Sequence, residues 1–143
     1  MTDLPQSRRA LQLLSRAAIV LLECDDAEFF THQSDAVHSL KALRTSGLQT
    51  VIVHDGLELA WGIHDGFLYT THKFGSTHCV SSSGTNDAFN ASFLASYIAG
   101  HELEACLGFG LVAARSVGCY VGSDVGLLRS FGHRAGKVSK KFL

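Results

Sequence analysis

Apolar residues in the first half of the chain fall into a pattern that predicts a strand, a helix and a second strand. The continuous apolar runs AAIVLL (residues 17–22) and TVIV (residues 50–53) are typical of strands buried on both faces. Between them, residues 34–46 carry apolar side chains at helical spacing, with an N-cap at one of their first two positions and Gly47 as a stop. A strand, a helix and a strand in succession form a βαβ unit, which implies a parallel sheet.

The second half of the chain predicts a hairpin followed by two helices. The Asp-Gly pair in HDG, residues 64–66, separates two apolar-rich runs, which is a strong signal for a β-hairpin. One helix is expected from near Asn86 to about Ala99, and another over roughly residues 102–117. The last 25 residues contain four further glycines and are expected to form a loop and a frayed end. The predicted class is α/β, a mostly parallel sheet that carries an antiparallel hairpin.

The composition is that of a folded domain without a strong charge. The length of 143 residues leaves room for one domain with one sizeable core. The net charge is −1 with acidic and basic residues interspersed, so nothing indicates binding to nucleic acid or to an acidic membrane. The basic residues near the C-terminus are interpreted as a solvated tail, namely Arg134, Lys137, Lys140 and Lys141.

The four cysteines and eight histidines form no pattern typical of a disulfide framework or a metal centre. The cysteines contain no C-x-x-C pair and the first residues are polar and basic, so we expect no signal peptide and reduced thiols in a cytoplasmic protein. No apolar run approaches the length of a membrane span. The histidines of the strand and turn region lack H-x-x-x-H spacing and are not expected to bind metal, namely His54, His64, His72 and His78.

The stretch SSSGTND, residues 81–87, leads directly into the first of the two later helices. Free backbone N–H groups and the helix dipole make such a start electropositive, and small residues allow a phosphate to approach the backbone. Asp87 at this junction could accept a proton from a hydroxyl held in front of it. The local pattern by itself favours a helix capped by Asn86 or Asp87, and the local sequence leaves both interpretations open.

The longer stretch SSSGTNDAFNASFLASYIAG resembles the signature of the ribokinase-like carbohydrate kinases, the phosphofructokinase B family. In that family, Gly-Ala-Gly-Asp opens the helix, and these residues fall on Gly84, Thr85, Asn86 and Asp87. The resemblance implies that Asp87 is the base that deprotonates the acceptor hydroxyl. It also implies that the amides of Gly84, Thr85 and Asn86 form the anion hole, with Ser83 beside the nucleotide.

Three further segments extend the resemblance along the chain. TVIVHDGLELA resembles the family's strand along the nucleotide, which implies that His54 and Gly56 lie at the cofactor site. IVLLECDDAEFF resembles the element associated with magnesium and phosphate, which implies that Glu23 and Asp26 lie near Mg²⁺. LEACLGFGLVAARSVGCYVGS resembles the helix beside the adenine, which brings Leu111 to the nucleotide. ATP and Mg²⁺ are the implied cosubstrate and cofactor.

The resemblance covers only the C-terminal half of the family's chain, so residues 1–143 are expected to form a single, truncated ribokinase-like domain. A truncated sheet leaves an edge strand without its neighbour, and we expect this to be the strand over residues 17–22. Pairing of that edge with a second copy or with a partner chain is therefore an expectation. The chain departs from the family's pattern at several positions, among them Glu23, Leu59, Ser81, Thr85, Asn86 and Ser92.

The function implied by the resemblance is phosphoryl transfer from ATP to a hydroxyl of a sugar or nucleoside. Two alternatives stay open because the half that binds most of the sugar has no counterpart here. One is a non-catalytic remnant that binds nucleotide or only folds. The other is a half-kinase that acts with a partner chain. The expected binding partner is a small-molecule sugar or nucleoside, and binding to nucleic acid or to a membrane is not expected.

Overall fold

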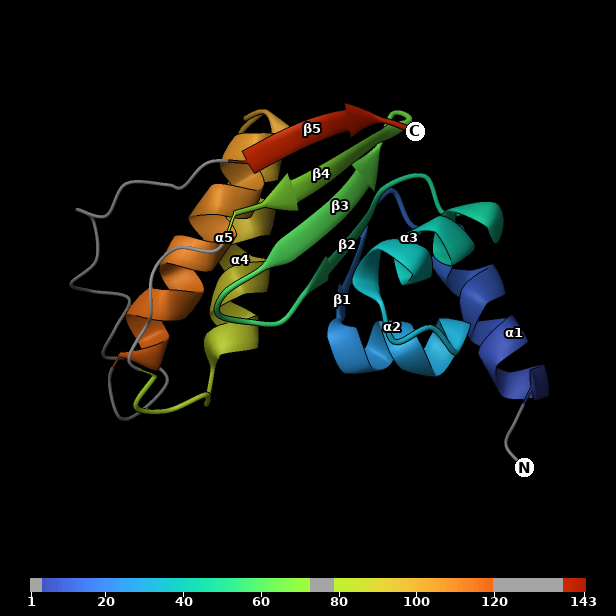
Figure 1. The fold of residues 1–143 in the computed structure, drawn as a ribbon, viewed down its shortest axis with the longest axis horizontal. Helices are drawn as coiled ribbons and strands as arrows, with labels where there is room; N and C mark the ends of the chain where they lie inside the picture. Colours follow the sequence, from blue (N-terminus) through green and yellow to red (C-terminus); the bar gives the residue numbers. More distant parts are fainter. Residues whose placement is uncertain (1–3, 73–78, 120–137) are drawn as a thin grey trace.

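A five-stranded sheet forms the centre of the molecule, and helices cover both of its faces (Figure 1). The computed structural model describes residues 4–72, 79–119 and 138–143. The strands lie in the order β1 (Val20–Glu23), β2 (Val51–His54), β3 (Ala60–His64), β4 (Phe67–Thr71) and β5 (Val138–Phe142). The helices of these residues are α1 (Leu4–Leu14), α2 (Cys24–Thr31), α3 (Ala36–Thr45), α4 (Thr85–Ile98) and α5 (Leu103–Gly118). No helix among them is long and apolar enough to cross a membrane.

The predicted βαβ unit and hairpin are both present. β1 and β2 are parallel, with Val20 opposite Val51, whereas the β2–β3, β3–β4 and β4–β5 pairs are antiparallel. The balance of strand directions thus differs from the expected mostly parallel sheet, because β1 and β2 form the one parallel pair among the described strands. Residues 55–59 and 65–66 are short connections, and short connections join antiparallel neighbours.

Alternation along β2 divides the core between the two faces of the sheet. Val51 and Val53 pack on one face with Leu40 and Leu43 of α3. Ile52 faces the opposite side and packs with the aromatic and aliphatic side chains of α4 and α5. Helices on both faces explain the continuous apolar run of β2, in which every residue is buried, as the sequence predicted.

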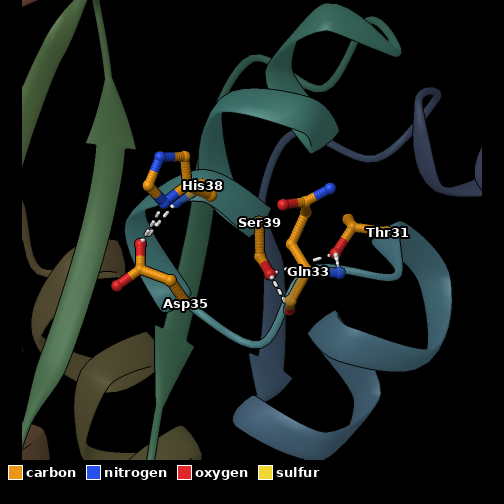
Figure 2. A network of polar contacts seen from close by, with 5 residues as sticks. All are labelled: Thr31, Gln33, Asp35, His38 and Ser39. Carbon is orange, nitrogen blue, oxygen red and sulfur yellow. Dashed lines mark hydrogen bonds and ion pairs between the residues drawn. The ribbon is translucent and has the colours of Figure 1, made fainter.

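Local hydrogen bonds fix the connection between α2 and α3, where Asp35 caps α3. The His38 N–H donates to Asp35 Oδ1 at 2.9 Å, and the His38 ring nitrogen Nδ1 lies 2.8 Å from the same oxygen (Figure 2). The Ser39 hydroxyl donates to the carbonyl of Gln33 and lies 3.0 Å from the Thr31 hydroxyl (Figure 2). Hydroxyls from the end of α2 and from α3 thus meet at this connection, and the Thr31 hydroxyl donates to the carbonyl of Ala27. The predicted N-cap is confirmed at Asp35.

The β3–β4 turn has the backbone conformation that its sequence predicts. Asp65 and Gly66 adopt φ angles of 49° and 81°, and His64 pairs with Phe67 across the turn. A two-residue hairpin connection with positive φ at both positions favours Asp-Gly.

Four parts of the chain differ from the sequence-based expectations. The helices α1 and α2 were not predicted, since α2 has only eight residues and buries only Ala27 completely. The first strand begins at Val20 and not at residue 17, because the N–H groups of Arg16 and Ala17 donate to carbonyls of the preceding turn. The expected frayed end is wrong for residues 138–143, which include β5.

β5 forms through contacts that no local pattern shows. Its partner is β4, which lies far away in the sequence, and the ammonium of Lys140 sits 4.3 Å from the centre of the Phe67 ring. Lys140 and Lys141 of the expected tail are therefore strand residues, though both are exposed. Arg134 and Lys137 lie outside the described residues.

Candidate active site

Three segments meet where the parallel strands β1 and β2 end. Glu23 and His54, the last residues of the two strands, lie opposite each other in the register. The loop of residues 55–59 follows His54 and passes beside the start of α4 (Figure 1). The carboxyl ends of parallel strands are where open α/β sheets bind ligands. This end of the sheet is therefore the candidate active site.

The start of α4 leaves its first amides without a side-chain cap. Gly84 is the N-cap residue with φ of 78°, and no side-chain hydrogen bond caps the start of the helix. The Thr85 hydroxyl and N–H both turn back to the carbonyl of Ser82, at 2.9 and 3.3 Å. The capping interpretation of Asn86 or Asp87 is thus wrong, because both residues lie inside the helix and neither caps it. Uncapped amides together with the helix dipole suit an anion.

Asp87 lies in the first turn of α4 with its side chain exposed. A carboxylate at this place is stabilised as an anion by the helix dipole. Within the described residues it takes part in no recorded hydrogen bond or ion pair. The carboxylate is therefore available to a hydroxyl that approaches the helix from solvent.

Asn86, which stands where the family has a glycine, has an ordinary helical backbone. The residue of this turn with positive φ is Gly84, and Asn86 itself does not adopt positive φ. Its side chain points to the neighbouring loop, because Oδ1 lies 2.5 Å from the position that a Cβ on Gly56 would occupy. Gly56 in turn has φ of 88°. The two residues thus form a close contact between the loop and α4 that only glycine at position 56 allows.

The loop of residues 55–59 is organised by one carboxylate oxygen. Oδ1 of Asp55 accepts hydrogen bonds from the N–H groups of Leu57, Glu58 and Leu59 at 3.0, 2.8 and 2.9 Å. The Asp55 N–H donates to the carbonyl of Leu59 and closes the loop. Leu59 does not adopt positive φ, so a side chain at this family glycine position is accommodated by the backbone.

His54 lies beneath the site and is fully buried, with 0% of its surface exposed. Its ring stacks on Phe89 of α4, with centroids 4.0 Å apart, and Nε2 lies 3.0 Å from Oδ1 of Asn90. Since an amide oxygen only accepts, Nε2 carries the proton, and Nδ1 has no partner among the described residues. Burial lowers the pKa of His54, against the opposing effects of Asn90 and Asp55. A neutral imidazole thus connects β2 to α4.

α5 contacts both the loop and the segment before α4. Arg115 donates from Nε to the carbonyl of Leu57 at 2.7 Å. The carbonyl of Gly118 accepts from the N–H groups of Val80 and Ser81 at 2.7 and 3.2 Å. α5 therefore holds together the two segments that flank the site.

Carboxylates gather at the end of β1. Glu23 and Asp26 are exposed, Glu23 at the end of the strand and Asp26 in the first turn of α2. Burial raises the pKa of the Cys24 thiol to about 11, with further contributions from Asp55, Asp25 and Glu23. The negative charges of β1, α2 and the loop therefore lie near one another. No cluster of three or more His, Cys, Asp or Glu side chains placed to hold a metal occurs in the described ranges.

Ser83 and Leu111, which the resemblance placed at the nucleotide, lie at different depths in the structure. Ser83 is exposed in the turn before Gly84, and its N–H donates to the Ser81 hydroxyl at 3.2 Å. Leu111 is 2% exposed and packs in the core with Phe89 and Ala114. The structure therefore brings Ser83 to the surface of the site and leaves Leu111 in the layer below it.

The sequence-based hypothesis missed three residues that shape the site, namely Asp55 as the centre of the loop, Asn90 as the partner of His54, and Arg115. Asp55 had a local signal, because an Asp followed by Gly favours a turn in which the carboxylate binds backbone amides ahead of it. Asn90 and Arg115 had no local signal, because the residues they contact, His54 and Leu57, are remote in the sequence.

Comparison with known proteins relates these features to one family. A family model described as pfkB family carbohydrate kinase matches residues 2–127. A curated relative from Archaeoglobus fulgidus, described as an uncharacterized sugar kinase, is 41% identical over 85 residues. These residues are 59% of this chain and 33% of the relative, so the match spans about a third of the relative's length.

Solved structures share the fold at low sequence identity. Adenosine kinase from Sinorhizobium meliloti matches with a TM-score of 0.74 and 22% identity, over 85% of this chain and 38% of the kinase. Fructokinase from Vibrio cholerae O395, in a form with fructose, ADP and calcium ion bound, matches with a TM-score of 0.74 and 13% identity. That match covers 85% of this chain and 41% of the fructokinase. The fold is therefore ribokinase-like, and the chain spans less than half of either kinase.

Proposed function

Because this chain belongs to the pfkB family of carbohydrate kinases, we propose that it transfers the γ-phosphoryl group of ATP to a hydroxyl of a sugar or nucleoside. The acceptor class is supported by the similarity to a fructokinase and an adenosine kinase. The observation that carries the proposal is the uncapped start of α4, with an exposed Asp87 in its first turn. A positioned base beside free backbone amides is suited to phosphoryl transfer.

Asp87 acts as the base in this proposal. Its carboxylate accepts the proton of the acceptor hydroxyl while the hydroxyl oxygen bonds to the γ-phosphorus. The bond between the γ-phosphorus and the bridging oxygen breaks, and ADP leaves with that oxygen. The proton ends on Asp87, and the phosphate ester carries the transferred group. The transfer is in line, so the base and the leaving group stand on opposite sides of the phosphorus.

The amides of Gly84, Thr85 and Asn86 stabilise the charge of the transferred group. The N–H groups of Gly84 and Asn86 are backbone donors at the helix start, whereas the Thr85 N–H also donates to the carbonyl of Ser82 at 3.3 Å and is shared between that carbonyl and the anion. The direction of the Asn86 side chain toward Gly56 supports this role, since the side chain then leaves its own amide uncovered. The bulk added by Asn86 is therefore compatible with the anion hole.

The nucleotide lies along the loop after β2 and the end of α5. Gly56 and Ser83 contact it directly in this proposal, whereas the buried His54 and Leu111 support the surface on which it rests. Gly56 is suited to a close approach because it has no side chain, and the Asp55 hydrogen bonds hold its loop in one conformation.

Glu23 and Asp26 are the residues that would hold Mg²⁺. Both are carboxylates, both are exposed, and Glu23 lies opposite His54 at the same end of the sheet. Mg²⁺ prefers oxygen ligands and is commonly held by one or two carboxylates together with substrate phosphates, which fits this pair. When bound, the ion would neutralise phosphate charge.

The test is a phosphoryl-transfer assay with γ-labelled ATP over a panel of sugars and nucleosides. We expect label on at least one acceptor, and a loss of about 100-fold or more for Asp87→Asn, since a positioned base contributes about 10²–10⁴-fold. Asp65→Asn, at an exposed residue outside the site, serves as the charge-matched control. Equal transfer by the wild type and Asp87→Asn contradicts the role of Asp87. If the wild type neither binds nucleotide nor transfers the phosphoryl group, the chain is a folded remnant without activity.

The free edge of β1 favours a second form of the proposal, a half-kinase that acts with a partner chain. β1 ends the sheet, as expected, and its residues Val20, Leu21 and Leu22 are apolar on both faces, as in a central strand. The opposite edge, β5, carries exposed lysines that discourage pairing, whereas β1 carries none. This form predicts Mg-ATP binding without transfer by the chain alone, and transfer by the chain alone would overturn it.

A further inference from the structure

A positively charged side chain from α5 holds the loop after β2 from the outside. Nε of Arg115 donates to the carbonyl of Leu57 at 2.7 Å, and Nη2 lies 3.5 Å from the carbonyl of Glu58. The guanidinium fork can bind two neighbouring carbonyls with a fixed geometry, which a lysine ammonium does not reproduce. Arg115 is therefore placed to fix the orientation of these two peptide groups.

The inside of the same loop is held by Asp55. Its Oδ1 accepts the amides of Leu57, Glu58 and Leu59, so the N–H groups of the loop point inward while Arg115 takes carbonyls on the other side. Backbone N–H and C=O groups need hydrogen-bond partners. In this loop Asp55 accepts from the N–H groups, and Arg115 donates to the C=O groups. Hydrogen bonds to charged groups are stronger than those between neutral groups.

Packing adds a second contact between α5 and the loop. A side-chain carbon of Leu57 lies 2.9 Å from the position that a Cβ on Gly118 would occupy, and Thr85 of α4 lies 3.4 Å from the same position. Gly118 is one turn beyond Arg115 on α5. The loop is therefore fixed between α5 and the first turn of α4, the two helices on the same side of the sheet (Figure 1).

We propose that Arg115 is a positioning residue for nucleotide binding, which holds residues 55–59 in the conformation that the nucleotide contacts. This inference rests on the proposed function. Arg115 acts in this proposal through the carbonyls of Leu57 and Glu58, to which it donates. Its removal lowers the affinity for the nucleotide and leaves the proton transfer at Asp87 unaffected.

The experiment compares Arg115→Met and Arg115→Lys with Arg44→Met, a charge-matched control on the exposed end of α3. Calorimetric titration with Mg-ADP measures affinity, and amide exchange by NMR measures the order of residues 57–59. We expect about tenfold weaker binding and faster exchange of the loop amides in Arg115→Met, since hydrogen bonds to a charged group are lost. Arg115→Lys should recover part of the affinity, and Arg44→Met should match the wild type.

The outcomes separate this inference from the proposed function. Absence of Mg-ADP binding by the wild type overturns both. Binding by the wild type together with equal affinity in folded Arg115→Met overturns the positioning role alone. If Arg115→Met does not fold, Arg115→Lys decides, because wild-type affinity and wild-type loop exchange in that variant contradict the need for the guanidinium fork. A general loss of stability would speed exchange across the sheet and α4 as well, whereas we expect it only in residues 55–59.

Discussion

Asn86 and Gly56 depend on each other at the scale of single residues. The Asn86 side chain fills the space in which a Cβ at position 56 would lie, and Gly56 has φ of 88°. Asparagine at a family glycine position is therefore tolerated because its side chain turns away from the helix start. The backbone demand for glycine in this turn falls on Gly84.

A double-mutant cycle tests this pair. Gly56→Ala should lower the free energy of unfolding by about 2–4 kcal/mol, because it combines a left-handed backbone with overpacking against Asn86. In the Asn86→Gly background only the backbone strain remains, so the cost should fall to about 1–2 kcal/mol. Denaturant titration of the four proteins measures the coupling. Costs that agree within about 0.5 kcal/mol in the two backgrounds would show that the residues do not interact.

The Asp87 prediction also belongs to the residue scale, because the proposed chemistry depends on one exposed carboxylate. Its position in the first turn of α4 was predicted from sequence, whereas the choice between cap and base was not. The choice required the N-cap to be seen at Gly84, which has no side chain. Sequence patterns predict a helix start to within a few residues, but the identity of the cap depends on backbone angles.

At the scale of elements, His54 connects β2 to α4. Its ring contacts Phe89 and Asn90, which follow Asp87 in the second turn of the helix. Because burial lowers the pKa of His54 in the folded state, the unfolded chain binds this proton first as the pH falls. The stabilisation is complete above the ordinary histidine pKa of about 6.5 and is lost as the pH falls through the lower folded-state pKa.

Denaturant titrations between pH 7.5 and 5, chosen to bracket the ordinary histidine pKa of about 6.5, measure this effect. We expect the free energy of unfolding to decrease over this range in the wild type and to decrease less in His54→Gln, which keeps an amide able to donate to Asn90. Asp35, whose pKa is lowered chiefly by the His38 N–H, changes stability only at lower pH. An unchanged slope in His54→Gln would assign the pH dependence to other histidines.

Most elements with a local signal were predicted, and those without one were not. The buried strand β2, the Asp-Gly hairpin, α3, α4 and α5 follow from apolar spacing and stop residues. β5 did not follow, because its sequence VSKKF gains a partner only when β4 is in place. α2 has two acidic residues in its first turn, which is favourable at a helix start, but its short length and weak apolar face give no clear helical period.

The site shows the same division between local and remote information. The turn before α4 and the strand end at His54 were found because each is continuous in sequence and resembles a known signature. Arg115 and Asn90 were not found, since each acts on a residue of a different element. Their positions depend on how α4 and α5 pack on the sheet, which no single segment encodes.

At the scale of the whole molecule, this chain is the part of a ribokinase-like fold that holds the start of α4, the loop after β2 and the end of β1. It spans 41% of the fructokinase and 38% of the adenosine kinase that it resembles. The described residues form one sheet with a hydrophobic core on each face.

Calorimetric titration of the wild-type chain with Mg-ATP tests the central claim most directly, because every proposed role depends on nucleotide binding. We predict a saturable heat with millimolar or tighter affinity. The heat should persist in Asp87→Asn, since the base acts after binding, and should weaken in a variant in which Gly84 is replaced by a residue that resists positive φ, Gly84→Val. Absence of any heat from the folded wild type at millimolar Mg-ATP would contradict the account.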